Sequence, residues 1–266
     1  FLLENETAAA DFAKKYSGRD AVVAPKFVGS TITLNACVTG QGVVVGAPFL
    51  QISGVAELNS TWSGTCGNDY GTELRLDEPQ RQQIFADTLR VGEAMRAQGY
   101  RGLFGLDFVV GTDVRLIEIN ARPPASVPTF TQLEHEQGTV SLLGLHLLEF
   151  LGIAYEINIP ETNQQKFAIP LRGSKLVFRN TSESVNSMQG DFKAGVYRIS
   201  DSGEMAYLRP GFSLSSISKA NEALLWSVKN GSLISPNAEI ATVVLPFSVT
   251  NPEGKLDEKS SRIVAK

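Results

Sequence analysis

Histidine and cysteine are scarce in this sequence. Among 266 residues there are only two of each. With His135 and His146 alone, a histidine-built zinc site is disfavoured. Cys37 and Cys66 show neither a disulfide framework nor metal-ligand spacing. So little cysteine suits a reducing compartment, and we therefore expect a cytoplasmic protein.

An excess of basic residues and a long apolar run are also lacking. The net charge is −4 and the isoelectric point is near 5.4, which gives no electrostatic footprint for nucleic acid. The most apolar segment, residues 141–155, is too short to cross a membrane and contains His146 and Glu149. We therefore expect neither a nucleic-acid nor a membrane partner. Because 42% of the residues are hydrophobic, the chain can build a core.

Periodicity and turn signals predict a mixture of helices and strands. A long helix is predicted from its start and stop signals: Asp77 can cap it, Pro79 lies in its first turn and Gly99 closes it. The segments predicted as helices are residues 5–18, 77–99, 139–153 and 218–228. We read residues 53–76 and 125–135 as loops. After about residue 160 the sequence changes to short strands with frequent glycine and proline.

That change predicts two units and an α+β fold. Residues 1–160 would form an antiparallel sheet with helices, and residues 161–266 a smaller, mainly β unit packed beside the hairpin described next.

A hairpin over residues 102–120 carries polar side chains inside apolar strands. Alternation places Leu116, Glu118 and Asn120 on one face, and Arg122 extends that row if the chain stays extended before proline. If the turn at "GTD" has an even number of loop residues, Asp107 lies directly opposite Glu118.

Two facing carboxylates repel each other unless a cation lies between them. Asn120 adds an amide oxygen, and hard oxygen ligands without imidazole or thiolate suit Mg²⁺ held together with substrate phosphates. Arg122 is suited to bidentate capture of a phosphate. The alternative is a half-exposed hairpin whose polar side chains are merely solvated.

These residues resemble the metal-binding hairpin of the ATP-grasp superfamily, in which an Asp on one strand faces an E-x-N-x-R segment on the next. The segments that carry the resemblance are "GYRGLFGLDFVV", "LIEINARPPAS", "VVAPKFVGSTITLNACV", "GAPFLQISG" and "GTCGNDYG". The β-rich tail is similar to the C-terminal lobe of the carboxylate–amine ligase branch. The resemblance covers most of residues 20–245.

The resemblance implies an ATP-dependent ligase that forms an acyl phosphate, transfers the acyl group to an amine and releases ADP and phosphate. By that correspondence Asp107, Glu118 and Asn120 hold Mg²⁺, and Arg122 stabilises charge on the transferring group. The implied partners are a small carboxylate and an amine of the amino-acid or peptide class. The sequence identifies neither substrate, and a homodimer is left open.

The adenine side departs from the family pattern. Ala24 and Thr31 stand where the family usually has acidic residues for adenine and ribose. Adenine would then be held by backbone groups around Pro25 to Val28, including those of Lys26 and Phe27, or only poorly, with the Lys26 side chain in a structural role.

Two buried-looking polar residues are further candidates for contacts with the nucleotide or substrate. Asn35 would share a sheet face with Thr33, or simply lie at an edge of the sheet. Asn68 lies between glycines and next to Asp69, an arrangement that also suits an Asx turn.

The family's phosphate-binding lysines would precede Phe1 in such an enzyme. We therefore expect this chain to be the C-terminal part of a longer ligase and to be inactive alone. The alternative is a degenerate ATP-grasp module that binds a ligand or partner without catalysis.

Overall fold

The computed structural model describes residues 3–20, 27–71, 76–169, 171–190 and 192–265. Lys26 and Ala24 therefore lie outside the described residues. Among the described helices, none is both long and apolar enough to cross a membrane.

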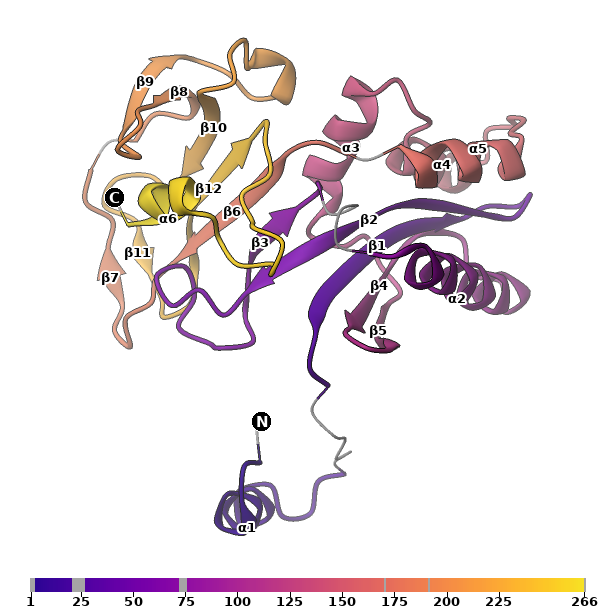
Figure 1. The fold of residues 1–266 in the computed structure, drawn as a ribbon, viewed down its shortest axis with the longest axis horizontal. Helices are drawn as coiled ribbons and strands as arrows, with labels where there is room; N and C mark the ends of the chain where they lie inside the picture. The colour runs from indigo at the N-terminus through magenta and orange to yellow at the C-terminus, as the bar shows by residue number, and fades with distance from the viewer. Residues whose placement is uncertain (1–2, 21–26, 72–75, 170, 191, 266) are drawn as a thin grey trace.

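A single ten-stranded antiparallel sheet runs through the molecule in the order β5-β4-β1-β2-β3-β6-β12-β10-β8-β9 (Figure 1). Its strands are β1 (Ser30–Val38), β2 (Val43–Ser53), β3 (Thr65–Asp69), β4 (Gly102–Val110), β5 (Val114–Asn120), β6 (Ser174–Arg179), β8 (Gly195–Ile199), β9 (Met205–Arg209), β10 (Glu222–Ser227) and β12 (Glu239–Leu245). A small second sheet pairs β7 (Asn186–Ser187) with β11 (Leu233–Ile234). The large antiparallel sheet and its helices confirm the predicted α+β class.

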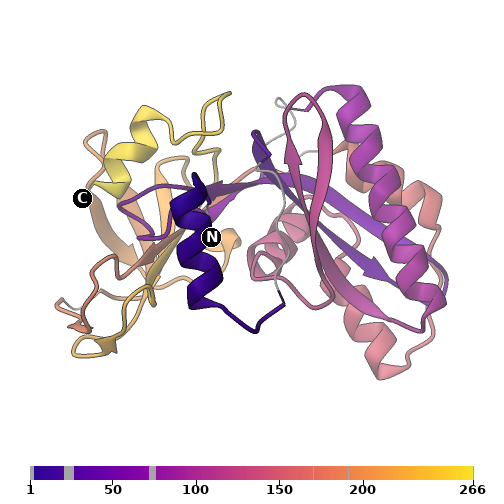
Figure 2. The ribbon, with the colours of Figure 1, turned by 90° about the horizontal axis from the view of Figure 1, so that it is seen from below.

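Helices cover both faces of the sheet, so each face has its own apolar core (Figures 1 and 2). The helices of the described residues are α1 (Glu6–Lys15), α2 (Glu78–Ala97), α3 (Val127–Glu136), α4 (Leu142–Leu151), α5 (Ile159–Ala168) and α6 (Glu258–Val264), with a 3₁₀ turn at Leu214–Ser216. Helix α1 lies apart from the sheet and buries no residue (Figure 1). Ile84 of α2 and Ile263 of α6 belong to the core on one face. Phe130 of α3 and Leu145 of α4 belong to the core on the other, which we call the α3 face.

Helix α5 covers the part of β2 that β3 leaves unpaired. Asn163 of α5 accepts a hydrogen bond from the Val45 amide at 2.8 Å and donates one to the Val43 carbonyl at 3.0 Å. These bonds satisfy backbone groups that an open strand edge would expose. A buried ion pair joins α5 to α3, with Lys166 Nζ 2.5 Å from Glu134 Oε1.

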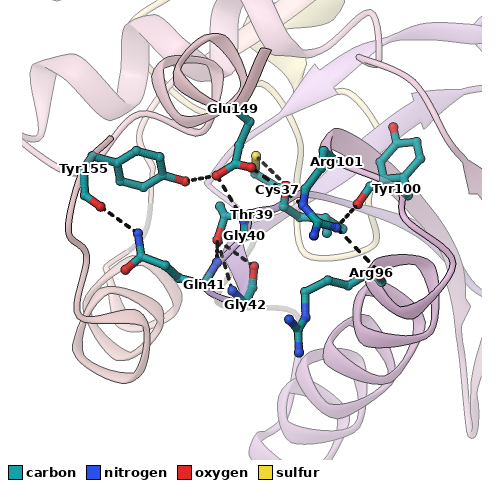
Figure 3. A network of polar contacts seen from close by, with 11 residues as sticks. Cys37, Thr39, Gly40, Gln41, Gly42, Arg96, Tyr100, Arg101, Glu149 and Tyr155 are labelled. Atoms are coloured by element: carbon teal, nitrogen blue, oxygen red, sulfur yellow. Dashed lines mark hydrogen bonds and ion pairs between the residues drawn. The ribbon is translucent and has the colours of Figure 1, made fainter. Parts of the chain in front are cut away.

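Glu149 of α4 fixes the turn between β1 and β2 (Figure 3). Its carboxylate accepts hydrogen bonds from the Gly40 amide and the Tyr155 hydroxyl, and Arg101 lies 3.8 Å away as an ion-pair partner. Burial raises the pKa of the neighbouring Cys37 thiol to about 12, so this cysteine stays protonated and inert. The network is structural, and it explains a charged residue in the most apolar stretch of the sequence.

The predicted helices 5–18, 77–99 and 139–153 are confirmed as α1, α2 and α4. Asp77 caps α2 in a capping box, with Pro79 in the first turn.

Three segments differ from prediction. Residues 125–135 contain α3, and residues 53–76 contain β3. Within residues 218–228, Glu222–Ser227 form β10 because alternate side chains meet the two cores: Ala223 and Leu225 on one face, Leu224 on the other. Pairing with β8 and β12 overrides the helical propensity of this segment.

The region beyond residue 165 is rich in strands, as predicted, but it is not packed beside the hairpin. Strand β6 pairs with β3, so β1, β2 and β3 separate it from β4 and β5. The proposed boundary at residue 160 falls inside α5, and the sheet continues across both parts. The division into two units stays a prediction.

Candidate functional site

Asp107 and Glu118 are direct cross-strand partners in the β4–β5 hairpin. The turn does not have the even number of loop residues that the prediction required: Val110 pairs with Val114, which leaves three loop residues. A register shift between Asp107 and Phe108 absorbs Ile117 as an extra residue. The predicted pairing is therefore confirmed, but it depends on the bulge and not on an even turn.

The bulge also separates Leu116 from Glu118, which were predicted to share a face. Leu116 pairs with Phe108 and packs on the α2 side, whereas Glu118 lies opposite Asp107 on the α3 face. The apolar side chain thus enters the core and the carboxylate does not.

A chain of hydrogen bonds holds the polar row together. Thr33 Oγ1 donates to Asp107 Oδ1 at 2.7 Å, and Asn120 Nδ2 donates to Asp107 Oδ2 at 3.1 Å. Arg122 Nη2 donates to Asn120 Oδ1 at 3.1 Å. The structure therefore brings Asp107, Asn120 and Arg122 together, as predicted, and adds Thr33 as a positioning residue.

Glu118 completes the row without joining the hydrogen-bond chain. Its side chain is exposed and makes no hydrogen bond or ion pair with any described residue. A carboxylate that lies opposite another carboxylate, with no cationic partner among the described residues, fits a Mg²⁺ ligand. No cluster of three or more His, Cys, Asp or Glu side chains occurs in the described ranges. A metal bound here would find two carboxylates and one amide as its protein donors.

The loop of residues 121–126 crosses the α3 face next to this row. Gly105 lies opposite Asn120, and a Cβ at Gly105 would come within 2.5 Å of Pro124 Cγ. Glycine is therefore required for the loop to lie against β4. At the far end of the loop, Ser126 is held by Asn35 and by the Tyr70 hydroxyl.

The remaining predicted ligand positions within the described residues are dispersed. Asn35 is fully buried, and its amide exchanges hydrogen bonds with the Ser126 hydroxyl at 3.1 and 3.2 Å. This geometry favours a role in holding the loop. Asn68 is 7% exposed, on the α3 face of β3. Phe27 and Val28 are 43% and 84% exposed, ahead of β1. Contacts of any of these residues with a ligand stay predictions.

Asp69 is a structural residue. It is fully buried and accepts hydrogen bonds from the Gly71 amide and from residues 248–250, which lie near the end of the chain. These donors leave no free side for a ligand, and they tie β3 to the segment after β12.

The sequence reasoning overlooked Lys175. This residue of β6 pairs with Asn68 and so lies on the α3 face. Its Nζ is 3.4 Å from the Ala125 carbonyl of the crossing loop. The signal in the sequence was a lysine directly between Ser174 and Leu176, which are both fully buried.

No protein-family model matches the sequence, and no curated protein matches it. Similarity does appear among solved structures. The N5-carboxyaminoimidazole ribonucleotide synthetase from Thermus thermophilus matches with a TM-score of 0.55 and 16% identity, over 98% of this chain and 57% of that one. The biotin carboxylase domain of a thermophilic 2-oxoglutarate carboxylase, bound to bicarbonate, matches with a TM-score of 0.53 and 15% identity, over 91% and 50%.

A third match is the biotin carboxylase domain of a single-chain bacterial carboxylase, with a TM-score of 0.51 and 18% identity over 93% of this chain and 49% of that chain. The chain thus spans about half the length of these solved structures. At such identities the likeness concerns the fold, and it agrees with the ATP-grasp fold that the hairpin motif predicted.

Proposed function

We propose that this chain is part of an ATP-dependent carboxylate–amine ligase. The reaction would phosphorylate a carboxylate, join it to an amine and release ADP and phosphate. The observation that carries the proposal is the pairing of Asp107 with Glu118, with Asn120 and Arg122 beside them on one sheet face. The likeness in fold to two biotin carboxylase domains and a ribonucleotide synthetase supports it.

Each residue of the row has a distinct role in this proposal. Asp107, Glu118 and Asn120 would hold Mg²⁺, which supplies charge neutralisation for the β- and γ-phosphates. Thr33 orients one oxygen of Asp107, which reduces the freedom of that carboxylate before a ligand arrives. Arg122 is exposed, so its guanidinium can leave Asn120 Oδ1 for a phosphoryl oxygen.

The adenine end of ATP would lie beside residues 27 and 28. Phe27 is exposed, and Arg115 lies 5.9 Å from the centre of its ring. Backbone groups there would replace the missing acidic contacts, with Asn68 further along the same face. Thr31 precedes Thr33 on β1 and cannot offer a carboxylate to a ribose.

The scope of the activity belongs to the same proposal. The substrates would be a small carboxylate and an amine of the amino-acid or peptide class. The reaction would take place in the cytoplasm, and a homodimer is left open. Because the chain spans about half of each solved structure that it resembles, we propose that the 266 residues alone have little ligase activity.

The proposal is tested by ADP release from the natural protein that contains these residues, with pooled carboxylates and amino acids. Arg122→Ala should lower the rate ~10²-fold or more, because it removes a positioned positive charge. Arg90→Ala is the matched control, since Arg90 is exposed on α2 and pairs only with Asp87 among the described residues. Equal rates in the two variants would argue against the role of Arg122.

A second candidate is a binding module without catalysis. The observation that favours it is Thr31, because a threonine replaces an acidic contact for the nucleotide. Such a module would bind ATP or another ligand without releasing ADP under any substrate combination. Substrate-dependent ADP release would exclude it.

A further inference from the structure

A cavity of about 420 Å³ lies on the α3 face between helix α3 and strands β6, β10 and β12. Its wall includes Lys175, Trp226, Glu239, Thr242, Gln132 and Thr129. The register of β3, β6, β12 and β10 places Lys175 and Trp226 on the same face as Asp107. The cavity therefore opens on the side of the sheet that carries the polar row.

Lys175 provides a half-buried positive charge at this wall. Its Nζ has one long hydrogen bond, to Ala125 O at 3.4 Å, and forms no ion pair with any described residue. Burial lowers the pKa of Lys175, while Glu239 opposes that shift. An ammonium group so placed gains from an anion that enters the cavity.

Glu239 provides the opposite charge. Its carboxylate accepts a hydrogen bond from Thr242 Oγ1 at 2.5 Å. Arg179 lies opposite Glu239 in the strand register, but its Nη1 donates to the Asn237 carbonyl, and no ion pair joins the two. The cavity thus presents one cation and one anion that do not pair with each other in the described structure.

We propose that this cavity binds a zwitterionic α-amino acid, with its carboxylate on Lys175, its ammonium on Glu239 and its side chain against Trp226. Opposite charges on one wall match a ligand that carries both, whereas Glu239 would repel a phosphate dianion. Trp226 is partly buried against the apolar core of this face and offers a surface for an apolar side chain.

The cavity is connected to the polar row by the crossing loop. Residues 121–126 start beside Asn120 and end where Lys175 contacts Ala125. Four strand-to-strand steps separate Lys175 from Asp107 in the sheet, so amino-acid binding in this cavity stands on its own geometry, apart from the proposed ligase function.

Binding of L-amino acids to the 266-residue chain, without nucleotide or Mg²⁺, tests the inference by calorimetric titration. We expect saturable binding of at least one amino acid with an apolar side chain. Its α-hydroxy acid and its amide should each bind at least ~10-fold more weakly, because each lacks one charge. Inorganic phosphate should not compete.

Lys175→Met and Glu239→Gln should each weaken binding by ~10-fold or more, and Lys175→Arg should retain part of it. Lys219→Met, which removes an exposed lysine outside the cavity, should bind like the parent chain. Circular dichroism confirms that each variant is folded. No binding of any amino acid, equal binding by Lys175→Met, or preference for phosphate would overturn the assignment. None of these results depends on ADP release, so the ligase proposal can fail or stand separately.

Discussion

Asp107 lies directly opposite Glu118 because Ile117 is accommodated as an extra residue in β5. Without that bulge, the three-residue turn would place Ile117 opposite Asp107 and would turn Glu118 to the other face. The bulge thus builds a like-charge pair on the edge of the sheet. Bulges at sheet edges commonly aim a side chain at a functional site, and this one aims a carboxylate.

Gly105→Ala should displace the crossing loop. The added Cβ would come within 2.5 Å of Pro124 Cγ, so either the loop or β4 must shift. We expect a loss of ~1–3 kcal/mol in the free energy of unfolding, measured by urea denaturation. Gly40→Ala is the control, because the nearest atom to its Cβ would be 3.9 Å away. Equal stabilities would show that the loop has room to move.

Lys166→Met should destabilise the protein more than removal of both charges. The lysine and Glu134 are 3% and 1% exposed, and the single change leaves a buried carboxylate without its cation. We expect a loss of ~3–5 kcal/mol, and recovery of most of it in the double variant Lys166→Met/Glu134→Leu. Additive losses in the denaturation series would mean that the pair is not coupled.

Glu222 should contribute to acid sensitivity. Hydrogen bonds from Arg209 and Ser218 lower the pKa of Glu222 from 4.5 to about 2. Since the folded state holds this carboxylate ionised, its contribution to stability is complete above pH 4.5 and is lost as the pH falls toward 2.

Denaturation midpoints at pH 6 and pH 3 measure this contribution. Glu222→Gln should have a lower denaturation midpoint than the parent at pH 6, and this difference between the two midpoints should be smaller at pH 3. A difference in midpoint that is the same at both pH values would mean that the substitution acts through packing and not through the charge of Glu222.

The polar row could be predicted from the sequence because its signal is local. A carboxylate inside an apolar strand is costly, and Asp107, Glu118 and Asn120 fall at matching positions of one hairpin. The bulge was not predictable, because Ile117 is as suited to a regular strand as to an extra position. Lys175 was missed for a different reason: its neighbours come from strands and a helix that are distant in the chain.

Segment 218–228 shows where local propensity fails. Its Ala, Glu and Leu residues favour a helix, but Leu224 and Leu225 have to face opposite cores at the same time. Only a strand between β8 and β12 meets both demands. The helix α3 was overlooked because residues 125–135 were read as a loop, although Pro128 lies in the first turn of α3, where helices tolerate proline.

Substrate-dependent ADP release by the Glu118→Gln variant of the natural protein is the most direct test of the ligase proposal. Folding should not depend on Glu118, because its side chain is exposed and faces a like charge, so the melting temperature should be unchanged or slightly raised. Ligation should fall by ~10²-fold or more, since Mg²⁺ loses one charged ligand. Glu136→Gln, at the exposed end of α3, is the control. Full activity in Glu118→Gln would show that Glu118 is not a metal ligand and would contradict the account.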